Sequence, residues 1–211
     1  MPADNFSPED FASCFDVSRE TIERLKIYAA MLAEWNARTN LVSQASLKQV
    51  WRRHFLDSAQ LAPFIPEPAN CLVDLGSGAG FPGLVLAEML RNRKTFRVVL
   101  YEATGKKCKF LEAVSRKLDL EVEIRNVRIE DSPPEPFDVI VARALAPLER
   151  LLPYAQRFWG PNSVALFLKG QNVGGELTQG AKSWNMKAQR HPSQSDPSGA
   201  ILRITELHRA A

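Results

Sequence analysis

The 211-residue sequence holds few cysteines and no long apolar run, and both absences exclude classes of protein. Its three cysteines, Cys14, Cys71 and Cys108, are an odd number without a CxxC spacing, so neither a disulfide framework nor a zinc site is indicated. No apolar run approaches the length of a transmembrane helix, and residues 1–11 are acidic and lack the apolar core of a signal peptide. We therefore expect a cytoplasmic, monomeric protein with no membrane partner and no metal site.

A large excess of either charge is absent as well. Lysine and arginine number 27 against 24 aspartate and glutamate residues, for a formal net charge of +3. Such a mild basic excess permits a nucleic-acid partner without requiring one. The basic residues gather in three short clusters, and a solvated helix face is the simplest interpretation of any single cluster. The clusters are Lys48, Arg52 and Arg53; Arg91, Arg93, Lys94 and Arg97; and Lys106, Lys107 and Lys109.

Residues 8–62 show only helical patterns. Apolar side chains recur at spacings of three and four from Ile22 to Trp35, which predicts one buried helical face, and Ser18 is placed to be its N-cap. A second helical run covers residues 46–62.

A proline-rich linker, residues 63–70, separates these helices from a different pattern. It divides the chain into an N-terminal helical module, residues 1–66, and a core, residues 67–211. In the core, short apolar runs alternate with amphipathic stretches, which predicts right-handed crossovers and a mostly parallel, doubly wound sheet. Strands are expected at 71–75, 96–101, 122–125, 137–142 and 164–168, and helices at 82–91, 105–118, 147–158 and 173–183.

Two further strands, 186–190 and 200–207, are joined by a turn rich in serine, proline, aspartate and glycine. This pattern predicts an antiparallel hairpin that closes the sheet. The expected fold class is therefore α/β and Rossmann-like, with a mostly parallel sheet, a C-terminal antiparallel hairpin and a small helical module. This arrangement is typical of class I S-adenosylmethionine-dependent methyltransferases, although a fold alone does not fix a function.

A glycine-rich segment, Asp74-Leu-Gly-Ser-Gly-Ala-Gly-Phe-Pro-Gly83, follows the first strand and leads directly into a helix. Glycines at this place let backbone N–H groups approach a ligand closely, and the helix N-terminus favours negative charge. We expect the loop to bind S-adenosylmethionine, with Asp74, Gly76, Gly78 and Gly80 among the contacts. A turn that merely lets the helix pack is the structural alternative.

A pyrophosphate-binding loop is the rival interpretation, because Gly78-x-Gly80-x-x-Gly83 matches the dinucleotide fingerprint. Glu102, at the end of the second strand, lies where a ribose-binding carboxylate belongs in either case. Asp74 favours the methyltransferase, since a carboxylate beside the loop would repel a pyrophosphate but suits a ligand with an ammonium and a sulfonium. The alternatives are an NAD(P)-dependent oxidoreductase and a catalytically silent RNA-binding protein of methyltransferase fold. The complete loop with Glu102 argues against the silent protein.

A series of segments between about residue 20 and residue 170 matches the pattern of one known family at the usual distances. They are Trp35-Asn36, Asn40-Leu41, His54-Phe-Leu-Asp57-Ser58, Asp74 to Gly83, Glu102, Lys106-Lys107, Phe110-Leu111, Arg128-Ile-Glu130, Phe137-Asp138, Ala142-Arg143-Ala144 and Lys169-Gly170. On these segments the chain resembles the ribosomal RNA small subunit methyltransferase G family. The resemblance implies methylation of guanosine N7 in a decoding-region stem-loop of 16S ribosomal RNA, with that RNA or the small ribosomal subunit as partner.

The loop after the fourth strand, Arg143-Ala-Leu-Ala-Pro147, lacks two motifs that other acceptor atoms need. Methylation of a pyrimidine carbon needs a cysteine nucleophile, and methylation of an exocyclic amine commonly uses an Asn/Asp-Pro-Pro-aromatic clamp. Guanine N7 carries a free lone pair and no proton at neutral pH, so it needs orientation but no general base. The absence of both motifs is consistent with N7 methylation.

Arg143 is the predicted catalytic residue and a predicted cofactor contact. It directly follows an apolar strand and should emerge at the carboxyl edge of the sheet, where a guanidinium can clasp a phosphate or the cofactor carboxylate. The alternative is an ion pair with Asp74 or Glu130 that organises this edge. On the catalytic interpretation, replacing Arg143 by alanine removes most activity and leaves the melting temperature near that of the wild type.

Three more residues are predicted to contact the cofactor. Ile129 and Glu130 follow the third strand, where the adenine is expected, although Glu130 would also suit a surface acid near a helix start. Phe81 could line the methionine end of the cofactor or simply pack beneath the loop.

RNA contacts are expected from Arg52 and Arg53, in the module that a bare methyltransferase core does not need, and from Lys169 at the end of the fifth strand. Solvated side chains are the alternative for all three. His54 and Asp57 are three apart on a predicted helix and share a face. We expect them to form a buried hydrogen-bonded pair that holds the module to the sheet, rather than an acid–base pair.

Overall fold

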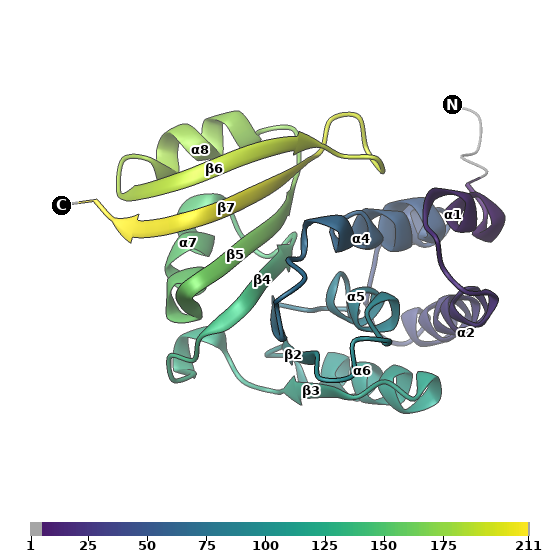
Figure 1. Ribbon diagram of the computed structural model, residues 1–211. Helices are drawn as coiled ribbons and strands as arrows, with labels where there is room; N and C mark the ends of the chain where they lie inside the picture. Colours follow the sequence, from purple (N-terminus) through teal and green to yellow (C-terminus); the bar gives the residue numbers. More distant parts are fainter. Residues whose placement is uncertain (1–5, 211) are drawn as a thin grey trace.

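The computed structural model describes residues 6–210 of the chain and shows a central sheet flanked by helices (Figure 1). No helix in this range is long and apolar enough to cross a membrane. The N-terminal helices are α1 (Pro8–Cys14), α2 (Arg19–Asn36), α3 (Gln44–Leu47), the π-helix η1 (Trp51–Leu56), α4 (Asp57–Ala59) and the 3₁₀ helix η2 (Ala62–Phe64).

The helix α2 is fixed at both ends by side-chain hydrogen bonds. The side chain of Ser18 accepts a hydrogen bond from the N–H of Thr21 at 3.2 Å, which confirms Ser18 as the N-cap. At the other end, the side-chain oxygen of Asn36 accepts hydrogen bonds from the N–H groups of Leu41 and Val42, both at 2.9 Å. These contacts set where the chain leaves α2 and turns toward the sheet.

The second helical run differs from the prediction. The sequence predicts one helix over residues 46–62, but α3 ends at Leu47, η1 has the wide turns of a π-helix, and α4 is three residues long. Turns of this π type are rare and frequently occur at functional sites. Here η1 and α4 carry His54 and Asp57 against the end of a core strand.

The sheet has seven strands in the order β3-β2-β1-β4-β5-β7-β6. The first five strands pair in parallel, and β7 runs antiparallel to both β5 and β6. The predicted α/β class, with a mostly parallel sheet and a C-terminal hairpin, is therefore confirmed. The strands are β1 (Cys71–Leu75), β2 (Arg97–Tyr101), β3 (Val122–Arg125), β4 (Phe137–Arg143), β5 (Trp159–Lys169), β6 (Trp184–Pro192) and β7 (Ala200–Arg209).

The helices of the core form two layers on opposite faces of the sheet (Figure 1). Helices α5 (Gly83–Met89) and α6 (Gly105–Leu118) share one apolar cluster with the N-terminal helices. Helices α7 (Leu148–Arg157) and α8 (Val173–Gly180) lie in a second cluster. The helical module therefore packs directly onto the Rossmann-like domain, and the division between residues 66 and 67 stays a prediction.

The strand order reverses between β1 and β4, which creates a crevice outside the carboxyl ends of these strands. Doubly wound sheets bind their ligands in such a crevice. The glycine loop, residues 76–83, leaves β1 here, and the loop 144–147 leaves β4. The fold thus brings together the two segments that the sequence singles out.

Candidate functional site

Three glycines of the loop adopt left-handed backbone conformations: Gly76, Gly78 and Gly80 have φ angles of 72°, 59° and 88°. A Cβ atom at Gly80 would lie 2.5 Å from the Tyr28 hydroxyl, and one at Gly76 would lie 2.5 Å from the Leu145 side chain. At Gly78 the nearest atom is a backbone oxygen 3.8 Å away. Gly80 therefore serves the packing of the helical module, whereas Gly78 faces open space where a ligand can approach.

Glu102 fastens this loop to the end of β2. One of its carboxylate oxygens accepts the N–H of Gly78 at 3.0 Å, and the other accepts the N–H of Thr104 at 2.7 Å. A carboxylate oxygen can accept more than one hydrogen bond. Glu102 can therefore brace the loop and still bind hydroxyl groups of a ligand.

A cavity of about 410 Å³, here called the first cavity, opens at the carboxyl ends of β1, β2 and β4. Gly76 and Glu102 border it on one side, and Ile129 and Glu130 of the short 3₁₀ helix η3 border it on another. Its volume lies within the roughly 300–1,000 Å³ of small-molecule sites. The Glu102 carboxylate can accept hydrogen bonds from the paired hydroxyls of a ribose, and the apolar side chain of Ile129 can pack against a flat base. This lining therefore suits a nucleoside. Four of the predicted cofactor contacts thus meet at one cavity.

Asp74 and Phe81 lie beneath the loop and do not border the first cavity. The Asp74 carboxylate is fully buried, with one oxygen accepting the N–H of Gly83 at 3.0 Å and the other without a partner among the described residues. The Phe81 ring stacks on Tyr28 and on His54, with centroids 5.2 Å and 4.7 Å apart. Phe81 therefore packs beneath the loop, as the alternative interpretation of this residue proposed. Asp74 holds the start of α5 through the N–H of Gly83.

The burial of Asp74 predicts a pH-dependent stability. Burial raises the pKa of its carboxyl to about 7, against the opposing effect of the hydrogen bond from Gly83. In the unfolded protein this carboxyl has a pKa of about 3.9. The folded protein therefore holds the proton more tightly, and the stability that the protonated Asp74 contributes is lost as the pH rises from about 4 to about 7. Asp74→Asn keeps an acceptor for Gly83 but does not titrate.

We therefore expect Asp74→Asn to gain stability relative to the wild type over this pH interval, by a few kcal/mol in total. The measurement is the free energy of urea unfolding of both proteins, without ligand, from about pH 4 to about pH 8. His54 titrates alike in both proteins and cancels in the difference. A difference that stays constant with pH would contradict the raised pKa of Asp74.

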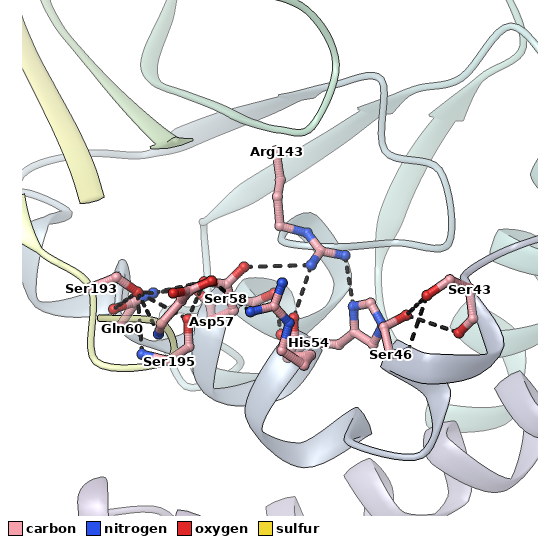
Figure 2. Close-up of polar contacts among 11 residues, drawn as sticks. Ser43, Ser46, His54, Asp57, Ser58, Gln60, Arg143, Ser193 and Ser195 are labelled. Atoms are coloured by element: carbon pink, nitrogen blue, oxygen red, sulfur yellow. Dashed lines mark hydrogen bonds and ion pairs between the residues drawn. The ribbon is translucent and has the colours of Figure 1, made fainter. Parts of the chain in front are cut away.

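Arg143, the last residue of β4, connects the sheet to the helical module (Figure 2). Its guanidinium donates to the backbone oxygen of Arg53 at 3.0 Å and to Nδ1 of His54 at 2.9 Å. It also lies 3.4 Å from a carboxylate oxygen of Asp57. Three acceptors of η1 and α4 therefore converge on one guanidinium.

The alternative interpretation of Arg143, an ion pair with Asp74 or Glu130, is wrong, since its carboxylate partner is Asp57. Glu130 instead accepts a hydrogen bond from the Tyr154 hydroxyl at 2.6 Å. Arg143 does not border the first cavity but a second one, described below. Its catalytic role stays a prediction, and its contacts are those of a positioning residue.

His54 and Asp57 hold the module to the sheet through Arg143 rather than through a bond to each other. Burial, together with the charges of Arg143 and Arg53, lowers the pKa of His54 to about 3, so the ring is neutral at pH 7 and its Nδ1 can accept the arginine hydrogen bond. No group of three or more His, Cys, Asp and Glu side chains within residues 6–210 could hold a metal ion. The contacts of His54 and Asp57 with Arg143 join η1 and α4 to the end of β4.

The turn between β6 and β7, residues 193–199, reaches the same cluster (Figure 2). The Ser195 hydroxyl donates to Asp57 at 2.5 Å, and the Gln60 side chain donates to the Ser193 hydroxyl at 3.1 Å. These partners are 138 and 133 positions apart in the sequence. The polar composition of this segment predicted a turn but gave no sign of its contact with η1 and α4. The C-terminal hairpin is thus part of the site, which the sequence did not predict.

The three residues predicted to contact RNA interact with other residues of this chain. Arg53 forms an ion pair with Asp196 of the turn at 2.7 Å. Lys169 pairs with Glu176 at 2.5 Å with a side chain only 8% exposed, so its interpretation as a solvated residue is wrong. The Arg52 guanidinium lies 4.8 Å from the centre of the Phe6 ring. RNA would have to exchange with Asp196 to reach Arg53.

Comparison with known proteins gives a consistent set of relatives. Residues 21–198 match the model of a family described as rRNA small subunit methyltransferase G. A protein of that name from Parvibaculum lavamentivorans is 48% identical over 202 residues, 95% of this chain and 89% of the relative. Another from Rhodospirillum rubrum is 48% identical over 204 residues, 97% of this chain and 100% of the relative.

Solved structures are similar in fold at low sequence identity. An O-methyltransferase from Bacillus cereus in complex with SAH has a TM-score of 0.57 and 19% identity, covering 90% of this chain and 92% of its own. The 16S rRNA methylase RmtB has a TM-score of 0.55 and 19% identity, covering 87% of this chain and 74% of its own. At this identity the likeness shows a shared class I methyltransferase fold and nothing further.

Proposed function

Because the chain belongs to the rRNA small subunit methyltransferase G family, we propose that it transfers the methyl group of S-adenosylmethionine to N7 of a guanosine in the decoding-region stem-loop of 16S ribosomal RNA. Family membership supports the methyl donor and the ribosomal RNA substrate. The choice of N7 is the finer part of the proposal and rests on the site.

The loop after β4 carries the choice of N7. Its residues Ala144, Leu145, Ala146 and Pro147 offer no side chain that could form a covalent bond or accept a proton. Guanine N7 presents a lone pair and loses no proton on methylation. Such a reaction needs two reactants held in line and little else from the protein, and positioning alone can supply much of the rate.

The residues of the first cavity fit S-adenosylmethionine, which supplies a methyl group on a sulfonium. Glu102 would hold the ribose hydroxyls, Ile129 would lie against the adenine, and Gly78 leaves room beside the loop. Asp74 is buried beneath the loop, so its carboxylate does not decide whether the loop binds a pyrophosphate. Family membership, rather than Asp74, is what sets aside the NAD(P)-dependent oxidoreductase.

Mapping of N7-methylguanosine in 16S ribosomal RNA tests the proposal. We expect one guanosine of the decoding-region stem-loop to carry the N7 methyl group in cells that contain this protein and to lack it in cells without it. Re-expression should restore the modification. A methyl group lost from a different atom would refute N7 while keeping the methyltransferase, and an unchanged RNA would refute the substrate.

Arg52 and Arg53 allow a test of RNA binding. If each neutralises one phosphate, replacing both by alanine should flatten the plot of log affinity against log salt by about one to two units, because each contact releases close to one counterion. Arg53 and Asp196 are 44% and 33% exposed, so a phosphate can displace the carboxylate. Affinity for S-adenosylhomocysteine should not change, because neither arginine borders the first cavity.

The measurement is RNA binding across a salt series, with S-adenosylhomocysteine binding as the control. A matched variant replaces Arg116 and Lys117, two exposed cations at the far end of α6, and should keep the wild-type slope. An unchanged slope in the Arg52 and Arg53 variant would make these arginines a solvated face and move the search to residues 91–97 and 106–109.

A further inference from the structure

A second cavity, of about 230 Å³, lies where η1, the ends of β4 and β5 and the β6–β7 turn meet. Its lining includes His54, Asp57 and Arg143 from the cluster of Figure 2 and Ser193 from the turn. Ala144 borders both this cavity and the first one. The two cavities are therefore neighbours, and an acceptor in one would stand beside a methyl donor in the other, as in-line transfer requires.

The size and surroundings of the second cavity suit a single nucleobase. Its volume is below the roughly 300–1,000 Å³ of sites for drug-sized molecules, so it cannot hold a stretch of RNA. Enzymes that modify a base act on single-stranded nucleic acid or extrude the base into a pocket. Arg53 and Asp196 also line the cavity and are partly exposed, which gives a phosphate a cation to reach.

One carboxylate oxygen in the lining suits guanine in particular. Oδ1 of Asp57 accepts hydrogen bonds from Gln60 at 3.0 Å and Ser195 at 2.5 Å, whereas Oδ2 accepts a longer one from Arg143 at 3.4 Å. Oδ2 therefore keeps capacity to accept. Guanine presents two donors, N1–H and the N2 amino group, on the edge away from N7, whereas adenine presents an acceptor there.

We propose that the second cavity receives the guanine to be methylated, extruded from single-stranded RNA, and that the turn 193–199 forms one of its walls. This assignment rests on the proposed function, and it names the subsite where that function takes its substrate. It gives the C-terminal hairpin a part in substrate binding, because the turn is held against η1 and α4 by Ser193, Ser195 and Asp196.

Two glycines provide a matched pair of variants. Gly170 borders the second cavity but not the first, and Gly174 lies in the first turn of α8. Apart from adjacent backbone, a Cβ atom at either position would have no heavy atom within 4 Å, so neither glycine is closely packed against other parts of the chain. We expect Gly170→Phe to lower kcat/KM for the RNA by about tenfold to 100-fold, the loss expected when reactants are displaced.

The same variant should bind S-adenosylhomocysteine within about twofold of the wild type, because the first cavity is untouched. Gly174→Phe should change neither quantity. Methylation by Gly170→Phe at the wild-type rate overturns the proposal. An equal loss in both variants, or a matching loss of S-adenosylhomocysteine affinity in Gly170→Phe, also overturns it.

A photochemical cross-link makes the test independent of any variant. The stem-loop RNA carries 6-thioguanosine at the methylated position, is bound to the wild-type protein with S-adenosylhomocysteine, and is irradiated. We expect the cross-linked peptides to come from η1 or from the turn 193–199. Cross-links confined to other surfaces, such as residues 91–97, overturn the assignment.

Methylation of the unmodified stem-loop by the wild-type protein separates the two proposals. If the RNA is methylated at N7 while the cross-links lie elsewhere, the subsite is wrong and the proposed function stands. If neither this RNA nor the assembled small subunit is methylated, the proposed function fails and the subsite fails with it.

Discussion

Replacing Arg143 by alanine is expected to lower the free energy of unfolding by about 3–5 kcal/mol, the usual cost of removing one partner of a buried charge pair. The Asp57 carboxylate, Nδ1 of His54 and the backbone oxygen of Arg53 would all lose their donor. The side chains of Arg143 and Asp57 are each only 18% exposed, so water cannot fully replace the hydrogen bonds that the guanidinium donates. Methyl transfer should be lost as well, because η1 would no longer be fastened to the carboxyl edge of the sheet.

This expectation reverses the one that the sequence suggested, which was an inactive protein of nearly normal stability. Urea unfolding at about pH 7 decides between them. Arg128→Ala is the matched control, because Arg128 is 69% exposed and its pair with Glu130 is 3.6 Å long, so its loss should cost less than about 1 kcal/mol. Arg143→Lys keeps the charge but not the forked donors and should be intermediate. An Arg143→Ala protein that is inactive yet as stable as the wild type would return Arg143 to a catalytic role.

Local patterns in the sequence were sufficient for most of the fold. The helix predicted over residues 105–118 is α6 with the same bounds, and all seven strands lie where apolar runs predicted them. Among the strands the largest error is in β5, which begins at Trp159 rather than at residue 164. Gly160, Pro161 and Asn162 disfavour strands, and they lie in an irregularity of the β4–β5 pairing, between the pairs Phe137–Trp159 and Val139–Val164, which a local pattern does not reveal.

The site was predicted less completely, because its contacts join distant parts of the chain. The partners of Arg143 lie 86 to 90 positions earlier, and Asp196 lies 143 positions after Arg53. A sequence can place a charge at a strand end, but which opposite charge arrives there depends on how the module and the hairpin pack. The burial of Asp74 has the same origin, since a carboxylate beside a glycine loop can point to either side of it.

Gly78→Val is expected to weaken binding of S-adenosylhomocysteine by about 100-fold or more while the protein stays folded. A branched side chain at a φ of 59° is strained by roughly 1–2 kcal/mol, a cost that a domain can bear. The added carbons meet no packed side chain, because the nearest atom to a Cβ here is the backbone oxygen of Gly76 at 3.8 Å. They would instead project into the open space beside the loop, where we propose that the cofactor approaches, and disturb the N–H that Gly78 donates to Glu102.

Gly80→Val is the contrasting variant, because its Cβ atom would lie 2.5 Å from the Tyr28 hydroxyl and it should lose stability before it loses affinity. Calorimetric titration with S-adenosylhomocysteine, paired with a melting temperature for each protein, separates the two effects. Gly78→Ala should fall between the wild type and Gly78→Val, since it carries the backbone strain without the branched carbons. If Gly78→Val binds S-adenosylhomocysteine as the wild type does, the ligand does not approach the loop at Gly78, and the cofactor must lie deeper toward Ile129 and Glu130.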